Sequence, residues 1–94
     1  MKKTESFVLI DGVYPPVEAE KILLELIIAK INHLERDAFS KHVRFNADIS
    51  SAKKRIEELN VSSELVKKMI SMISDSNTEL KIKSTVTIEF HNPE

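Results

Sequence analysis

Apolar residues recur at alternating spacings of three and four along the second half of the chain. This period places them on one side of a helix, and the predicted helix covers residues 48–75. The segment 16–37 carries a matching stripe, widened on both flanks by further apolar residues. Because a ten-residue connection, 38–47, joins the two segments, we expect an antiparallel helical hairpin. The first stripe is Leu24, Ile27, Ile31, Leu34 and Ala38, flanked by Ile22, Leu23, Leu26 and Ile28, and the second is Ile49, Ala52, Ile56, Leu59, Ser63, Val66, Ile70 and Ile73.

Two β-strands are expected to enclose this hairpin in the sequence. Residues 6–10 are rich in β-branched and aromatic side chains, and Asp11-Gly12 after them is interpreted as a turn toward a helix that starts at Pro16. Residues 79–90 alternate apolar and polar positions, which predicts a strand with one buried face. The fold class is therefore α+β, a strand-helix-helix-strand domain over residues 1–94 in which the hairpin packs on a small antiparallel sheet.

Dimerisation is expected to complete this sheet. A two-stranded sheet is marginal in water, and the last strand is predicted to extend several residues beyond the first. The first helix also carries more apolar surface than one neighbouring helix covers. We therefore expect a twofold dimer with a shared four-stranded sheet, in which Lys81 and Lys83 limit further growth. The predicted interface residues are Phe7, Leu9, Ile22, Leu23, Leu26, Val86 and Ile88.

The connection and the second helix contain local signals of their own. Asn46 tolerates a left-handed backbone, and either Asn46 or Asp48 can cap the helix that follows. Residues 60–63 are the weakest turn of that helix and a site where it could kink.

Composition and charge narrow the classes of function. The 94 residues carry a net charge of −1, and acids and bases balance within residues 17–47 and within residues 48–78, which disfavours strong attraction to nucleic-acid phosphates. The chain has no cysteine, which excludes disulfides and thiolate metal sites and is compatible with a reducing cytoplasm. Its apolar runs are too short to span a bilayer. A cytoplasmic protein without membrane association is expected.

Catalytic signals are weak, so the chain is not expected to be an enzyme or to hold a cofactor. With one glycine it has no phosphate-binding loop, and no nucleophile elbow is present. His33 and Asp37 are four apart on the first helix, which supplies two metal ligands where a site needs more. If the hairpin turns near residue 44, His33 meets Arg55, and Lys30 meets Glu57 or Glu58. This predicts an interhelical charge network or, as an alternative, a small-ligand or metal site on its flank.

Aromatic and basic residues alternate near the predicted hairpin tip. Phe39, Lys41, His42, Arg44 and Phe45 could stack bases and contact phosphates, together with the basic run 53–55. The nearby acids, Glu57, Glu58 and Glu64, cancel much of that positive field. Weak nucleic-acid binding at the tip is therefore kept as a second alternative.

The order of several short segments resembles a group of short, uncharacterised bacterial proteins. The segments are Ile10-Asp11-Gly12, Glu18-Ala19, Lys30-Ile31-Asn32-His33, residues 51–59 and Leu80-Lys81-Ile82-Lys83. Members of the group carry Arg-Phe-Gly where this chain has Arg44-Phe45-Asn46, and asparagine also tolerates a left-handed turn. The resemblance implies one compact domain and no particular activity. The leading hypothesis is a non-enzymatic homodimeric interaction module, which leaves room for a further protein partner.

Overall fold

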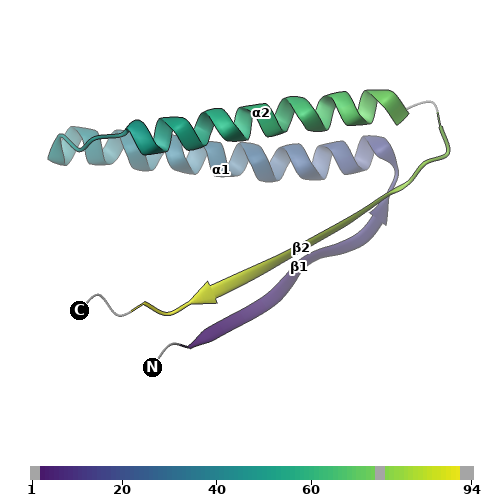
Figure 1. Ribbon diagram of the computed structural model, residues 1–94, viewed down its shortest axis with the longest axis horizontal. Helices are drawn as coiled ribbons and strands as arrows, with labels where there is room; N and C mark the ends of the chain where they lie inside the picture. The colour runs from purple at the N-terminus through teal and green to yellow at the C-terminus, as the bar shows by residue number, and fades with distance from the viewer. Residues whose placement is uncertain (1–2, 74–75, 92–94) are drawn as a thin grey trace.

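The computed structural model describes residues 3–73 and 76–91, and its elements follow the order β1-α1-α2-β2 (Figure 1). Strand β1 covers Thr4–Tyr14, helix α1 covers Pro16–Phe45, helix α2 covers Ser50–Ile73, and strand β2 covers Leu80–Glu89. The two strands pair antiparallel in a two-stranded sheet. The predicted strand-helix-helix-strand α+β fold is confirmed.

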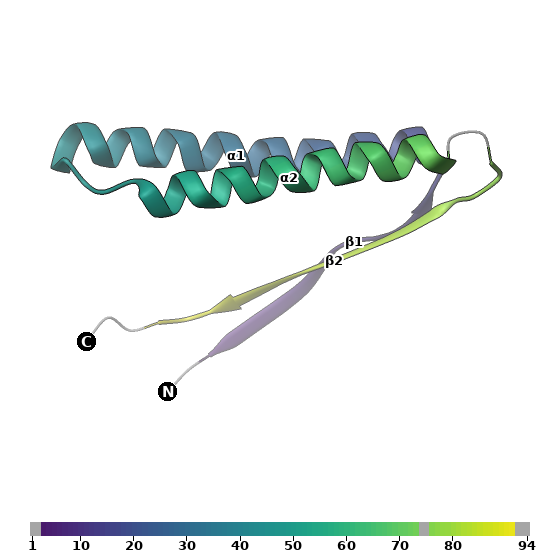
Figure 2. The same cartoon turned by 45° about the horizontal axis from the view of Figure 1, so that its top comes forward.

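The two helices lie side by side as an antiparallel hairpin (Figures 1 and 2). The two predicted stripes account for the less exposed sides of the helices: Ala38 and Ile70 are buried, and the remaining stripe residues are half-buried. Helix α2 continues through residues 60–63 without interruption. The period of three and four therefore identified the seam between the helices, where burial of apolar surface stabilises the pair.

The connection between the helices is shorter than expected, because α1 continues to Phe45 rather than ending at residue 37. Asn46 ends the helix with a left-handed backbone, φ 50°, and its N–H donates to the carbonyl of His42 at 2.9 Å. Asp48 then caps α2, because its Oδ1 accepts a hydrogen bond from the Ser50 N–H at 3.0 Å. The extension escaped prediction because its apolar residues after Ala38, namely Phe39, Val43 and Phe45, are exposed, so the helical period is lost while the backbone stays helical.

Strand β1 continues to Tyr14, so the predicted turn at Asp11-Gly12 is wrong. Asp11 pairs with Lys83, and Gly12 pairs with Ile82. Gly12 has no positive φ. Instead, the Tyr14 ring lies close to it, and a Cβ at Gly12 would be 2.8 Å from the Tyr14 hydroxyl oxygen. The glycine makes room for an aromatic side chain within the strand. The two strands are consequently of similar length, and the predicted overhang of the second strand is absent.

One irregularity changes which residues of β1 share a face of the ribbon formed by β1 and β2. The register shifts between Val8 and Ile10, so Leu9 is an extra residue in β1, a β-bulge. Phe7 pairs with Val86, while Ile10 pairs with Ser84. Since directly opposed residues share a face, the bulge puts Phe7 and Ile10 on one side although they are three apart. We call this side the apolar ribbon face; it comprises Phe7, Ile10, Tyr14, Leu80, Ile82, Val86 and Ile88.

Among the described residues, the buried cluster lies at one end of the molecule. Ala19 of α1, Ile70 of α2 and Ile82 of β2 form its buried centre. From this closed end the ribbon and the hairpin diverge toward an open end (Figures 1 and 2). Exposure of the apolar ribbon face rises accordingly, from 9% at Ile82 to 43% at Ile88. The Cα positions extend 52 × 33 × 14 Å, so the molecule is long and thin.

Candidate interaction surfaces

The open end of the ribbon is the first candidate surface. Phe7 and Ile88 are 49% and 43% exposed there, and Phe90, just after β2, is 50% exposed. The Phe90 N–H donates to the carbonyl of Lys3 at 3.0 Å, and the Lys3 Nζ lies 5.8 Å from the centroid of the Phe90 ring. These contacts continue the strand pairing past β2, so the exposed apolar side chains are held on an ordered surface.

The seven predicted interface residues are divided between different parts of the molecule. Phe7, Val86 and Ile88 lie on the apolar ribbon face, whereas Leu9 occupies the bulge and is 51% exposed. On α1, the neighbours Ile22 and Leu23 are half-buried against the closed-end core. Leu26, one turn later, is 40% exposed. Ile22 and Leu23 thus support the fold of the single chain, and the remaining five offer apolar surface.

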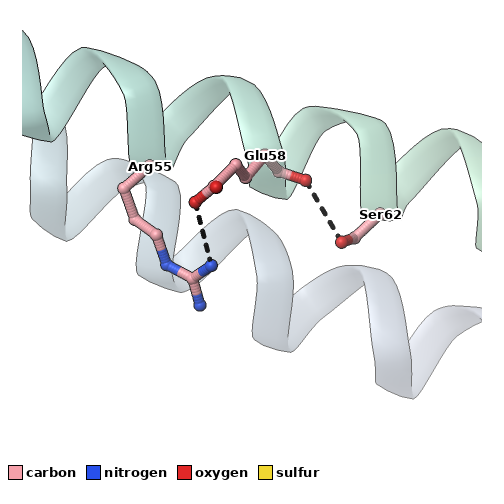
Figure 3. A network of polar contacts seen from close by, with 3 residues as sticks. All are labelled: Arg55, Glu58 and Ser62. Carbon is pink, nitrogen blue, oxygen red and sulfur yellow. Dashed lines mark hydrogen bonds and ion pairs between the residues drawn. The ribbon is translucent and has the colours of Figure 1, made fainter.

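The predicted polar residues form ion pairs along single helices. Asp37 bonds Lys41 at 3.1 Å on α1. On α2, Arg55 bonds Glu58 at 3.3 Å, and the Ser62 hydroxyl donates to the Glu58 carbonyl at 3.2 Å (Figure 3). The observed hairpin loop, residues 46–49, lies beyond the predicted tip at residue 44. This moves every expected cross-hairpin partner by about two helical turns.

The expected pairs of His33 with Arg55 and of Lys30 with Glu57 or Glu58 are therefore not formed. Within the described parts of the chain, the ion pairs between helical residues join positions three or four apart on one helix. No group of three histidine or acidic side chains capable of holding a metal ion occurs among residues 3–73 and 76–91. The polar residues thus have the arrangement of solvated helix surfaces, where single ion pairs contribute little.

The hairpin tip exposes two aromatic rings beside basic side chains. Phe39 and Phe45 are 71% and 74% exposed. Arg44 lies next to Phe45 in the last turn of α1, while the positive charge of Lys41 is paired with Asp37. Exposed rings near a guanidinium are the elements that stacking of nucleic-acid bases requires. The prediction of a tip that combines aromatic and basic groups thus keeps its structural basis.

Helix α2 carries a second apolar stripe that sequence reasoning did not identify. Its members recur every three or four residues, which was the available signal, and they are Val61, Leu65, Met69 and Met72, from 49% to 76% exposed. A surface hollow beside this stripe is lined by α2 residues alone. Enzyme sites are usually concave and surrounded by several elements. A hollow on one helix lacks the walls that would exclude water from a reaction.

Asp48 has a shifted pKa in the loop between the helices. Its pKa is lowered because the backbone N–H and the hydroxyl of Ser50 both hydrogen-bond to the carboxylate. The residue is exposed and lies at the start of α2, away from the surface hollow. Its titration accordingly reflects helix capping.

Comparisons with known proteins identify no relative: no family model matches the chain, and neither do the curated proteins or the solved structures. The resemblance to short bacterial proteins stays a prediction. Neither helix in the described part of the chain combines the length and hydrophobicity that crossing a membrane requires.

Proposed function

We propose that this protein is a non-enzymatic cytoplasmic interaction module that acts as a homodimer through its strands and first helix. The observation that carries the proposal is the large solvent-accessible surface area of a single chain. The accessible surface is 7662 Å², whereas a compact monomer of this mass exposes about 5,500 Å². The radius of gyration is 17.1 Å, against about 12.4 Å for a compact domain of this length. A single chain is therefore far from compact.

The size of this difference matches a permanent interface. The excess is about 2,200 Å² per chain by the same scaling. Two chains that buried this excess together would remove about 4,400 Å², which lies in the range of obligate homodimers and well above that of transient contacts. The thin shape of the molecule makes such burial geometrically feasible, because the apolar ribbon face is accessible toward the open end.

The composition of the exposed surface also favours a protein partner. Four hydrophobic side chains are buried in the described part of the chain, and two of them are alanines. Larger apolar residues stay exposed instead, among them Phe7 and Ile88 on the apolar ribbon face and Leu26 on α1. Contiguous apolar patches on a stable protein mark interaction sites. A second copy carries a surface of the same kind.

Light scattering coupled to size exclusion tests the proposal. At micromolar concentration we expect twice the 10.7 kDa of one chain. Phe7→Asp should shift the protein to monomer, because a carboxylate in the interface loses its hydration. The matched control is Phe45→Asp, the same change at the hairpin tip, which should leave the dimer intact. A wild-type protein that stays monomeric at micromolar concentration refutes the proposal.

A second candidate function is weak binding of single-stranded nucleic acid at the hairpin tip. The exposed Phe39 and Phe45 beside Arg44 favour it. Fluorescence anisotropy with a labelled oligonucleotide at low salt would detect such binding, which should weaken with added salt and in Arg44→Ala. Absence of binding at low salt excludes this candidate and leaves the dimer proposal unaffected.

A further inference from the structure

We propose that the second copy joins along the free edge of β2, antiparallel and centred on Thr85, to form a four-stranded sheet of order β1-β2-β2-β1. This inference rests on the homodimer proposed above and specifies its strand, register and symmetry. Three observations carry it: the bulge in β1, the hydrogen bond between Phe90 and Lys3, and the charges along β2.

The bulge distinguishes the two free edges of the ribbon. Leu9 interrupts the regular spacing of backbone groups along β1, whereas β2 is a regular strand without glycine or proline. Bulges disfavour continued pairing, and native sheets use them to protect their outer strands. With β2 at the centre, each bulged β1 becomes an outer edge, and the bulges, rather than Lys81 and Lys83 as expected from the sequence, end the sheet at four strands. With β1 at the centre, both bulges would lie inside the sheet, and two regular β2 edges would stay open.

One hydrogen bond determines which backbone groups of β2 point outward. In an antiparallel ladder, a residue directs its N–H and its C=O to the same neighbouring strand, and this direction alternates along the chain. The Phe90 N–H donates to Lys3, so the even-numbered residues of β2 face β1. The odd-numbered residues, from Lys81 to Glu89, therefore present their donors and acceptors to the free edge. They are the groups that a second copy of β2 would pair with.

The side chains select one register among the symmetric ones. Opposed residues must share a face. The twofold axis therefore lies midway between one residue of β2 and the same residue of the partner, and odd-numbered positions pair with odd-numbered positions. Centred on Thr85, Lys81 lies opposite the partner's Glu89, and Ile82 lies opposite the partner's Ile88. Opposite charges and paired apolar side chains both stabilise a strand pair. The pairing also covers every residue from 80 to 90.

The neighbouring registers are less favourable. Centred on Ser84, Glu89 lies opposite the partner's Glu79, which places like charges across the pair. Centred on Val86, Lys83 replaces Lys81 opposite the partner's Glu89, while Lys81 lies opposite the partner's His91, and the paired segment is two residues shorter. The shift to Ser84 thus adds a like-charge pair, and the shift to Val86 shortens the paired segment. The charges along β2 and the length of the paired segment together favour the axis at Thr85.

This arrangement brings the exposed half of each ribbon next to the covered half of the other. Phe90 and Ile88, at the open end, lie beside the partner's Leu80 and the partner's Ile82. Ile82 is the buried strand residue at the closed end, in contact with the core under the hairpin. The twofold axis runs perpendicular to the sheet, so both hairpins lie on its apolar face. Each hairpin then extends the cover over the part of the sheet that its partner leaves exposed.

Single cysteines at neighbouring positions measure the register directly. The chain has no cysteine of its own, so engineered thiols are the only ones present. The backbone N–H and C=O groups of Ser84 and Val86 point toward β1. Across the proposed interface, Ser84 and the partner's Val86 therefore form a non-hydrogen-bonded pair. Such pairs have Cα atoms about 4.5 Å apart, within the range that a disulfide bridges. Ser84→Cys and Val86→Cys chains, one of them mass-tagged, are refolded alone or together and oxidised mildly.

We expect a disulfide-linked heterodimer from the mixture and little linkage from either variant alone, because Ser84 lies opposite the partner's Val86. Linkage of Ser84→Cys alone indicates an axis at Ser84, and linkage of Val86→Cys alone indicates an axis at Val86; either result overturns the register. Ser51→Cys, an exposed position on α2, controls for random collision. If light scattering shows a dimer but neither the single variants nor their mixture form a disulfide-linked species, the proposal that the chains pair along β2 is wrong, while the homodimer proposal stands. A monomer refutes both.

Discussion

Truncation of Ile70 tests whether the closed-end core holds the hairpin and the ribbon together. Ile70 is 6% exposed and belongs to the cluster with Ala19 and Ile82, where α1, α2 and β2 meet. Ile70→Ala removes three carbon atoms from this contact. Buried isoleucine-to-alanine changes cost about 2–5 kcal/mol. The core here is small and lies where the ribbon and the hairpin begin to diverge, so the surroundings can collapse or admit water. We therefore expect the lower part of that range, about 2–3 kcal/mol.

The matched control lies on the same stripe of α2. Ile56 is half-buried near the hairpin tip and does not belong to the closed-end cluster or to the residues packed against it. Ile56→Ala makes the same chemical change, and because less surface is buried there we expect about 1–1.5 kcal/mol. Urea unfolding followed by circular dichroism measures both variants. Protein concentration is held constant, because association contributes to the apparent stability of a dimer.

The comparison between the two variants decides the outcome. If Ile70→Ala costs no more than Ile56→Ala, the closed-end cluster is not the main link between the two layers, and the described core is wrong. A larger loss for Ile70→Ala with an unchanged denaturant slope supports the core as described. A reduced slope would indicate that the variant exposes less additional surface on unfolding, as expected if the ribbon has already separated from the hairpin.

Two further predictions concern single local contacts. Asp48→Ala should destabilise the protein, while Asp48→Asn keeps an acceptor for the Ser50 N–H. Because the folded pKa of Asp48 lies below its ordinary value of 3.8, its contribution is present above pH 3.8 and is lost as the pH falls through the folded pKa. The free energies of unfolding of wild type and Asp48→Asn, plotted against pH, should converge toward that acid range. A constant difference between them at all pH values would contradict the cap. Gly12→Ala should cost about 1–3 kcal/mol by crowding the Tyr14 ring, and much less in a Tyr14→Leu background, which a double-mutant cycle measures.

Much of the fold could be predicted because the spacing of apolar residues along the sequence matches the sides of the helices and strands that are buried. The stripe from Ile49 to Ile73 and its counterpart on the first helix are the seam of the hairpin, and the alternation after residue 79 is the strand β2. The left-handed Asn46 and the cap at Asp48 also follow from the chemistry of their side chains. These features are local: each depends on residues within a few turns of one another.

The candidate site was harder to predict because it depends on distances between segments. A hairpin loop a few residues beyond the expected tip was enough to remove the predicted contact of His33 with Arg55. The bulge at Leu9 changes the face on which Phe7 lies, and no residue in this segment indicates a bulge from the sequence alone. The second stripe of α2 had a visible period, yet whether it is covered depends on the neighbours that tertiary structure provides.

The sequence by itself determined which segments become helices and strands and which sides of them avoid water. Hydrophobic periodicity encodes these properties in each segment, whatever its neighbours are. Only the tertiary structure decided that the apolar stripes of the hairpin and the ribbon meet at one end and diverge at the other (Figure 2). That angle depends on the length of a four-residue loop, on the continuation of β1 to Tyr14 and on one bulge. It leaves Phe7 and Ile88 accessible, and with them the surface proposed to join a second copy.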